Sequence, residues 1–153
     1  MNLNKLLRSN INGMTPYSSA RDEYKDLEAD MVFLDANENP FDNSLNRYPD
    51  PQQTALKKLI SGQKKVPMDQ ILLGNGSDEV LDLIFRAFCE PNQDRILTFP
   101  PTYGMYDVLA NLNAIKNIQV PLTSDFDLDV DRILKQVQPE TKLLCICSPN
   151  NPS

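Results

Sequence analysis

The chain has 153 residues, of which 41% are hydrophobic and 24% are charged, values typical of a single soluble globular domain. Its net charge of -6 excludes the basic surface that nucleic acid or an acidic membrane would require. No apolar run approaches the roughly 20 residues of a membrane helix, and the N-terminus lacks the apolar segment of a secretory signal, so we expect a cytoplasmic protein.

The three cysteines are an odd number, and the sequence contains no histidine. Cys145 and Cys147 lie in the apolar run 142–147, where such small side chains pack into a core. Without histidine and without a second pair of cysteines, the pattern predicts no metal site.

The first 50 residues are expected to contribute little core. Residues 1–30 are mostly polar, and a short strand is predicted over 31–35. Residues 36–51 are rich in Asn, Asp and Pro and predict a long loop, a kind of segment that is often functional. A helix is expected from Pro51, which suits a first turn, to Gly62.

Strands and helices alternate from residue 70 onward. Strands are predicted over 71–73, 95–99, 115–122 and 142–147, and helices over 77–89, 102–113 and 129–138. This alternation predicts an α/β domain with a largely parallel sheet covered by helices. The helix over 77–89 is apolar on most sides and should be deeply buried, with Asp82 and Arg86 paired on its remaining stripe.

The turn before that helix is the sharpest local feature. Gly74 and Gly76 permit a tight turn, and the free N–H groups of the helix start that follows can bind an anion. The alternative is that Ser77 merely caps the helix, and on the pattern alone capping is favoured. The turn is neither a Walker loop nor a dinucleotide fingerprint, since it lacks the required lysine and third glycine.

Two further segments follow predicted strand ends, where open α/β sheets bind ligands. Tyr103 could stack on a planar ring, and Tyr106 shares its helical face. The alternative is that both tyrosines pack on the sheet with their hydroxyls at the surface. Asn150 and Asn151 precede a proline in a stiff turn with side-chain amides free to hydrogen-bond, although on the pattern alone an ordinary turn is favoured.

Six segments, taken together and in order, resemble the histidinol-phosphate aminotransferases, a family of fold-type I pyridoxal-phosphate enzymes. They are TPYSSAR (15–21), LDANENPF (34–41), NRYPDP (46–51), LLGNGSDEVLDLIFRAFCEP (72–91), FPPTYGMY (99–106) and LLCICSPNNPS (143–153). The resemblance covers nearly the whole chain from Thr15 onward. Ser153 stands where the family usually has threonine, which keeps a hydroxyl.

The resemblance implies a set of residues that bind the cofactor, pyridoxal 5'-phosphate. The helix-start amides of Gly76, Ser77 and Asp78 would hold its phosphate. Tyr103 would stack on the pyridine ring, and Asn151 would bond the phenolic oxygen of that ring.

The resemblance also implies residues that act at a dimer interface and on substrate. Tyr48 would reach across a homodimer to the phosphate bound by the neighbouring subunit. Tyr17, Asn37 and Glu38 belong to segments that would close over the substrate.

The implied fold is a three-layer α/β/α large domain of a pyridoxal-phosphate transferase, incomplete and preceded by an N-terminal arm. Residues 1–50 would form the arm and the substrate-side loop, and residues 51–153 the first part of the cofactor-binding domain. The implied activity exchanges an amino group between L-histidinol phosphate and 2-oxoglutarate, in histidine biosynthesis. The Schiff-base lysine would lie beyond Ser153, so we expect these 153 residues alone to be inactive.

Three alternatives remain open. The protein could be a related fold-type I enzyme, such as an aromatic aminotransferase or a threonine-phosphate decarboxylase. It could be a phosphate- or nucleotide-binding module that uses only the turn at 74–78. It could also be an inactive, truncated gene product.

Overall fold

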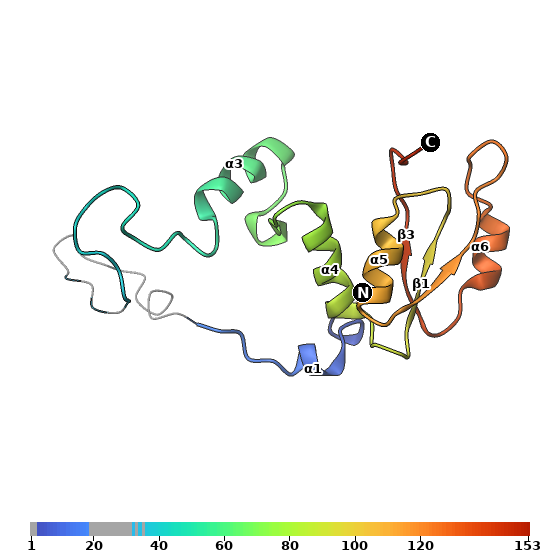
Figure 1. Cartoon of the computed structure of the whole chain (residues 1–153), viewed down its shortest axis with the longest axis horizontal. Helices are drawn as coiled ribbons and strands as arrows, with labels where there is room; N and C mark the ends of the chain where they lie inside the picture. Colours follow the sequence, from blue (N-terminus) through green and yellow to red (C-terminus); the bar gives the residue numbers. More distant parts are fainter. Residues whose placement is uncertain (1–2, 19–31, 33, 35) are drawn as a thin grey trace. The chain divides into compact units, whose positions relative to one another are not determined.

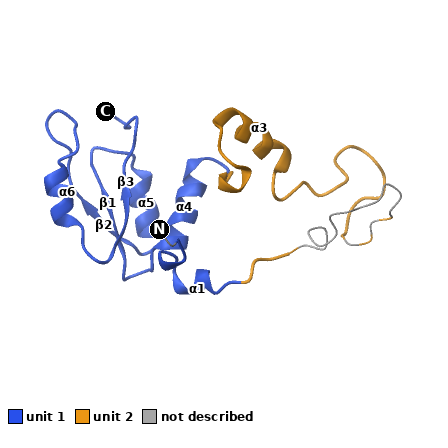
Figure 2. Ribbon diagram, turned by 180° about the vertical axis from the view of Figure 1, so that it is seen from behind, with its two compact units in different colours: residues 1–14, 74–153 blue, residues 15–73 orange. Residues whose placement is uncertain are grey.

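The structure is a computed structural model, and it describes residues 3–18, 32, 34 and 36–153. The chain divides into two compact units, which are described separately below. Unit 1 consists of residues 1–14 and 74–153, and unit 2 consists of residues 15–73 (Figure 1 and Figure 2).

Unit 1 is built on a parallel sheet of three strands. They are β1 (Arg95–Thr98), β2 (Lys116–Gln119) and β3 (Thr141–Cys145), arranged in the order β2-β1-β3. All pairings are parallel, and Leu97 lies opposite both Ile118 and Leu144. The largely parallel sheet is therefore confirmed, and each strand falls within its predicted range apart from Thr141, one residue earlier than predicted.

Helices cover both faces of this sheet. They are α4 (Ser77–Phe88), α5 (Met105–Leu112) and α6 (Val130–Gln136). Ile96 packs against Phe85 of α4 and Leu109 of α5, whereas its neighbour Leu97 packs in a second cluster with Ile133 of α6. Successive side chains of a strand point to opposite faces, so unit 1 has three layers, as the α/β/α prediction requires. Among the described residues, no helix has the length and apolar character needed to cross a membrane.

The core of unit 1 is small and is centred on β1, which contributes buried side chains to both faces of the sheet. Ile96 and Leu97 have exposed fractions of 0%, and burial of each such side chain stabilises the fold by roughly 1.5–3 kcal/mol. The prediction that α4 is deeply buried was wrong, because only Phe85 of this helix is buried. Leu83 is 43% exposed. The reason is that the described elements of unit 1 cover α4 on one side only. The predicted pair between Asp82 and Arg86 is confirmed, with 2.8 Å between Oδ2 and Nε.

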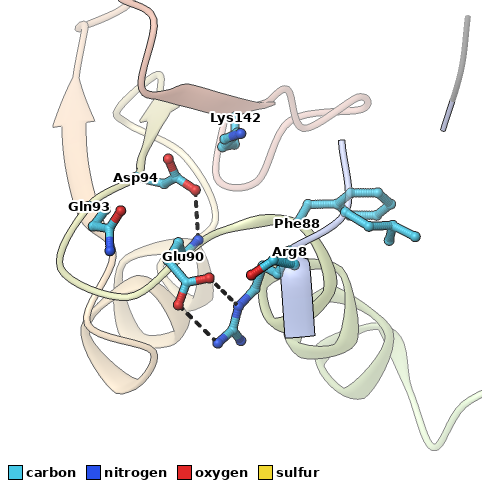
Figure 3. Close-up of a pocket in the computed structure, with 8 residues that line it drawn as sticks. Arg8, Phe88, Glu90, Gln93, Asp94 and Lys142 are labelled. Atoms are coloured by element: carbon cyan, nitrogen blue, oxygen red, sulfur yellow. Dashed lines mark hydrogen bonds and ion pairs between the residues drawn. The ribbon is translucent and has the colours of Figure 1, made fainter. Parts of the chain in front are cut away.

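The N-terminal segment is anchored to the end of α4. This segment contains the short helices η1 (Leu3–Lys5) and α1 (Ser9–Asn12). The N–H of Arg8 donates to the carbonyl of Ala87 at 2.9 Å, and its guanidinium donates to the carbonyl of Arg86 at 3.0 Å. The same guanidinium bonds both carboxylate oxygens of Glu90, at 3.2 and 3.3 Å (Figure 3). Arg8 thus satisfies carbonyls that the last turn of a helix leaves without a partner.

A hollow opens beside this anchor. Its lining includes Arg8, Glu90, Gln93, Asp94 and Lys142 (Figure 3). Asp94 precedes β1 and Lys142 is near the start of β3, so the hollow lies at the amino-terminal edge of the sheet. Open α/β sheets bind ligands at the opposite edge, and we therefore do not assign this hollow as the functional site.

Unit 2 contains α3 (Thr54–Lys64), η2 (Met68–Gln70) and the predicted loop over 36–51, which has neither helix nor strand. Helix α3 begins three residues later than predicted. Asp50 explains the difference, since its carboxylate accepts bonds from the N–H groups of Gln52 and Thr54, both at 2.7–2.8 Å. A hydrogen bond from the side chain of Thr54, followed by these two backbone bonds, holds the pKa of Asp50 below its ordinary value.

One predicted strand is absent from the described residues, and a second can be compared at two positions only. The strand over 71–73 was wrong: Ile71 is extended, but no described segment pairs with these residues in a ladder. Most of the strand predicted over 31–35 lies outside the described residues. Within it, Val32 and Leu34 are described, belong to no strand and are 81% and 89% exposed.

Candidate functional site

Three segments of unit 1 meet at the carboxyl-terminal edge of the sheet. Residues 99–104 follow β1, residues 146–153 follow β3, and the start of α4 lies beside the first of these loops. β1 and β3 are adjacent and parallel, so the two loops necessarily emerge at the same edge.

The start of α4 depends on two glycines. Gly76 is the N-cap residue, with φ 86° and ψ 169°, a backbone conformation that is open essentially to glycine alone. At Gly74, an added Cβ would lie 2.8 Å from Cγ2 of Val80 and 2.9 Å from Oε2 of Glu79, so both side chains would have to shift to admit it.

The simple capping interpretation of Ser77 was wrong. Ser77 is the first residue inside α4, and no side chain caps the helix at Gly76. Glu79 instead reaches back, and its carboxylate accepts the N–H of Asn75. The N–H groups of Ser77 and Asp78 belong to the first turn, which has no intrahelical acceptors, so they are available to an anion.

Tyr103 joins the loop after β1 to this helix start. Its hydroxyl donates a hydrogen bond of 2.9 Å to Oδ1 of Asp78. This bond, followed by burial, raises the pKa of Tyr103, so the hydroxyl keeps its proton and remains a donor. The ring is part-buried and stands edge to face with Tyr106, with 5.7 Å between ring centroids.

Tyr106 packs against the ring of Tyr103. It is buried, and burial together with a hydrogen bond to Cys147 raises its pKa to about 12. Both tyrosine hydroxyls are therefore bonded within the protein. The predicted helix over 102–113 begins only at Met105, because Thr102 and Tyr103 belong to the site loop.

The loop after β3 contributes the two asparagines. Asn150 is part-buried, and its side chain bonds to Thr102, to the carbonyl of Pro101 and to Ser153. Asn151 is exposed. Asn150 and Thr102 were not among the predicted site residues, because no pattern in the sequence marks a bond between two separate loops.

The arrangement fits a phosphate-bearing aromatic cofactor. The helix start offers N–H donors for the phosphate, and Oδ1 of the Asp78 carboxylate accepts the hydroxyl of Tyr103. An aromatic ring lies next to these donors, and side-chain amides follow on the neighbouring strand. This combination meets the chemical needs of pyridoxal phosphate better than those of phosphate alone.

The remaining predicted residues belong to unit 2. Tyr17 and Tyr48 are 91% and 63% exposed. The side chain of Glu38 is only 4% exposed, and its carboxylate accepts from the guanidinium of Arg47 at 2.8 Å and from the N–H of Tyr48 at 2.7 Å. Glu38 therefore fixes the backbone of the loop that presents Tyr48. Asn37 lies in the same loop.

Comparison with known proteins places the chain in a family. Residues 20–153 match the aminotransferases of class I and II. The chain belongs to this aminotransferase family. It is 62% identical over 152 residues to a histidinol-phosphate aminotransferase of Christiangramia forsetii, covering 99% of this chain and 43% of that protein. It is 59% identical to that of Flavobacterium psychrophilum, covering 99% of this chain and 44% of that protein. The chain thus spans less than half of the length of these relatives.

Solved structures agree with the family. The histidinol-phosphate aminotransferase from Clostridium acetobutylicum matches with a TM-score of 0.61 and 27% identity, over 72% of this chain and 31% of that one. The N-succinyldiaminopimelate aminotransferase from Mycobacterium tuberculosis matches with a TM-score of 0.64 and 27% identity, over 71% of this chain and 31% of that one. The α/β/α layers of unit 1 are therefore part of an aminotransferase fold.

Proposed function

We propose that the carboxyl-terminal edge of the sheet in unit 1 binds pyridoxal 5'-phosphate. The observation that carries the proposal is the bond of 2.9 Å between the hydroxyl of Tyr103 and Asp78. It keeps an aromatic ring beside the N–H groups of a helix start, which are the two features that a phosphorylated pyridine needs.

Each residue contributes a separate interaction in this proposal. The N–H groups of Ser77 and Asp78 bind the phosphate, helped by the positive end of the α4 dipole. Gly76, whose own N–H donates to the carbonyl of Gly74 at 3.0 Å, shapes the turn that presents them. Tyr103 covers one face of the pyridine ring and excludes water from it. Asn151 donates its side-chain amide to the phenolic oxygen.

The bound cofactor supplies an electron sink for the bonds broken at the amino-acid carbon. The covalent chemistry also needs a lysine to carry a proton, and the described part of unit 1 offers none at this edge. Lys5 lies in η1, in the N-terminal segment anchored to the end of α4. Lys116 and Lys142 lie at or near the amino-terminal ends of β2 and β3. Lys135 lies in the last turn of α6, which leads back to the same amino-terminal edge. We propose that the protein's remaining length, judged from its relatives, supplies the lysine.

Unit 2 is proposed to serve substrate and partner. Tyr48 is exposed in a loop fixed by Glu38 and would reach the phosphate of a second subunit in a homodimer. Tyr17 and Asn37 would contact the substrate directly, and Glu38 would act by holding the loop in place.

The proposed reaction converts L-histidinol phosphate and 2-oxoglutarate into imidazole acetol phosphate and L-glutamate, in cytoplasmic histidine biosynthesis. The names of relatives at 50–62% identity over nearly the whole chain support this substrate. Solved structures at 27% identity include both a histidinol-phosphate aminotransferase and an N-succinyldiaminopimelate aminotransferase, so the assay compares substrates directly.

The test uses the protein at the length its gene encodes, loaded with pyridoxal phosphate. Formation of L-glutamate from 2-oxoglutarate should depend on L-histidinol phosphate and exceed the rate with phenylalanine or tyrosine. Release of carbon dioxide from threonine phosphate would instead indicate the decarboxylase. Tighter binding of ATP than of pyridoxal phosphate would indicate a nucleotide-binding module and would reject the proposal.

A further inference from the structure

Asn150 connects two loops that the proposed function uses separately. Its Nδ2 donates to the carbonyl of Pro101 at 2.8 Å and to the hydroxyl of Ser153 at 2.7 Å. Its Oδ1 accepts from the hydroxyl of Thr102 at 2.9 Å. The amide thus uses both of its donor hydrogens and one acceptor position, all within the two loops.

The loop after β1 is held in place by hydrogen bonds from the segments that follow β2 and β3. Pro100 and Pro101 have no N–H group, so they can enter hydrogen bonds only through their carbonyls. The carbonyl of Pro100 accepts from the N–H of Leu122, beyond the end of β2, at 2.8 Å. The carbonyl of Pro101 accepts from Asn150, beyond the end of β3. The loop is therefore held from both neighbouring strands.

The positions next to this connection are the ones proposed to touch the cofactor. Thr102 precedes Tyr103, and Asn150 precedes Asn151. Rotation of either loop would change the distance between the ring of Tyr103 and the amide of Asn151. Side chains that must hold a ligand need support from a second set of fixed bonds, since small displacements of the contacting groups weaken binding.

We propose that Asn150 is a positioning residue that fixes Tyr103 and Asn151 at the spacing the cofactor ring requires, with Thr102 as its partner. The inference rests on the proposed binding of pyridoxal phosphate. Asn150 itself does not touch the cofactor, so its effect reaches the ligand only through these two neighbours.

The test compares variants of the full gene product by titration with pyridoxal phosphate and by the absorption band of the bound cofactor. Asn150→Ala should weaken binding by about 10- to 100-fold, the range typical of residues that orient the direct ligands of a bound metal ion. Thr102→Val should weaken binding less, because it keeps both bonds donated by Asn150. Thr102→Ser keeps the hydroxyl, and it should retain both the wild-type affinity for pyridoxal phosphate and the wild-type absorption band.

Asn113→Ala is the matched control. The Nδ2 of Asn113 also makes two bonds, away from these loops. The bond to Asp82 at 2.7 Å connects the end of α5 to α4, and the bond to the carbonyl of Leu109 at 3.0 Å lies within the end of α5. This variant should lower thermal stability and leave the affinity unchanged. In the cofactor-free protein, Asn150→Ala should speed hydrogen exchange at residues 102–104, whereas Asn113→Ala should not.

The outcomes separate the two proposals. If the wild type binds no pyridoxal phosphate, the proposed function fails and this inference fails with it. If the wild type binds pyridoxal phosphate, and Asn150→Ala and Thr102→Val bind it with the wild-type affinity, the positioning role alone is rejected. Equal losses in Thr102→Val and Thr102→Ser would also reject it, since the hydroxyl would then be irrelevant.

Discussion

Replacement of Gly76 with alanine tests whether the helix start has the geometry that the proposed site needs. Gly76 has φ 86° and ψ 169°, a conformation that costs other residues about 1–3 kcal/mol. An added Cβ would meet no atom within 4 Å. The cost therefore comes from the backbone conformation and not from a collision.

This strain should appear in one of two measurable quantities. If Gly76→Ala keeps the backbone as it is, the free energy of unfolding should fall by about 1–3 kcal/mol. If the backbone relaxes, the N–H groups of Ser77 and Asp78 turn away from the phosphate. The affinity for pyridoxal phosphate should then fall by about 5- to 150-fold, since each 1.4 kcal/mol corresponds to about tenfold.

The assay combines urea unfolding with titration by pyridoxal phosphate, on the full gene product. Gly104→Ala is the matched control, because Gly104 has φ -65° and ψ -21° and open space around its Cα. An alanine fits this helical conformation, and should leave stability unchanged or raise it by up to about 1 kcal/mol. The reasoning is refuted if the two variants have the same stability and the same affinity.

Three further predictions concern unit 1. Phe85→Ala should lower the free energy of unfolding by about 3–5 kcal/mol, because Phe85 is 1% exposed, whereas Leu83→Ala in the same helix should cost much less; urea unfolding measures both. Arg8→Met keeps the apolar stem but removes the bonds to Glu90, and should cost about 1 kcal/mol because that pair is partly exposed. Burial raises the pKa of Cys89 from 9.0 to about 12, so its contribution to stability is complete below pH 9 and is lost as the pH rises towards 12. The slope of stability against pH in that window should be smaller in Cys89→Ala.

Specific results would contradict these predictions. Equal losses in Phe85→Ala and Leu83→Ala would mean that the core is not centred on Phe85. Unchanged hydrogen exchange at residues 7–14 in Arg8→Met would mean that Arg8 does not anchor the N-terminal segment. An identical slope between pH 9 and 12 in Cys89→Ala would mean that the thiol of Cys89 ionises as it does in the unfolded chain.

Much of unit 1 could be predicted from local patterns. The apolar run 95–99 becomes the buried central strand β1, because buried strands need apolar side chains on both faces. The run 142–147 also forms a parallel strand, but β3 lies at the sheet edge and none of its residues is fully buried. The helix over 77–89 was located to within one residue at its end. Its exposure could not be predicted, since burial depends on which elements surround the helix, and a sequence pattern shows only which sides are apolar. The strand predicted over 71–73 failed for a related reason, because a strand exists only when another segment pairs with it.

The candidate site divides in the same way. The turn at Gly74 and Gly76 could be found because an unusual backbone conformation selects glycine locally. The bond between Tyr103 and Asp78 joins residues 25 positions apart, and the bond between Thr102 and Asn150 joins residues 48 positions apart. Resemblance to a family indicated Tyr103 and Asp78 but not their mutual bond. The sequence marked the amide of Asn150 as free to hydrogen-bond, but its partners became known only from the parallel pairing of β1 and β3, which brings both loops to one edge.

A crystal structure of the full gene product with pyridoxal phosphate tests the proposed cofactor site most directly. We expect the phosphate oxygens to accept hydrogen bonds from the N–H groups of Ser77 and Asp78, with the ring of Tyr103 stacked on the pyridine. A phosphate bound elsewhere, or a pyridine ring that Tyr103 does not cover, would contradict the proposal.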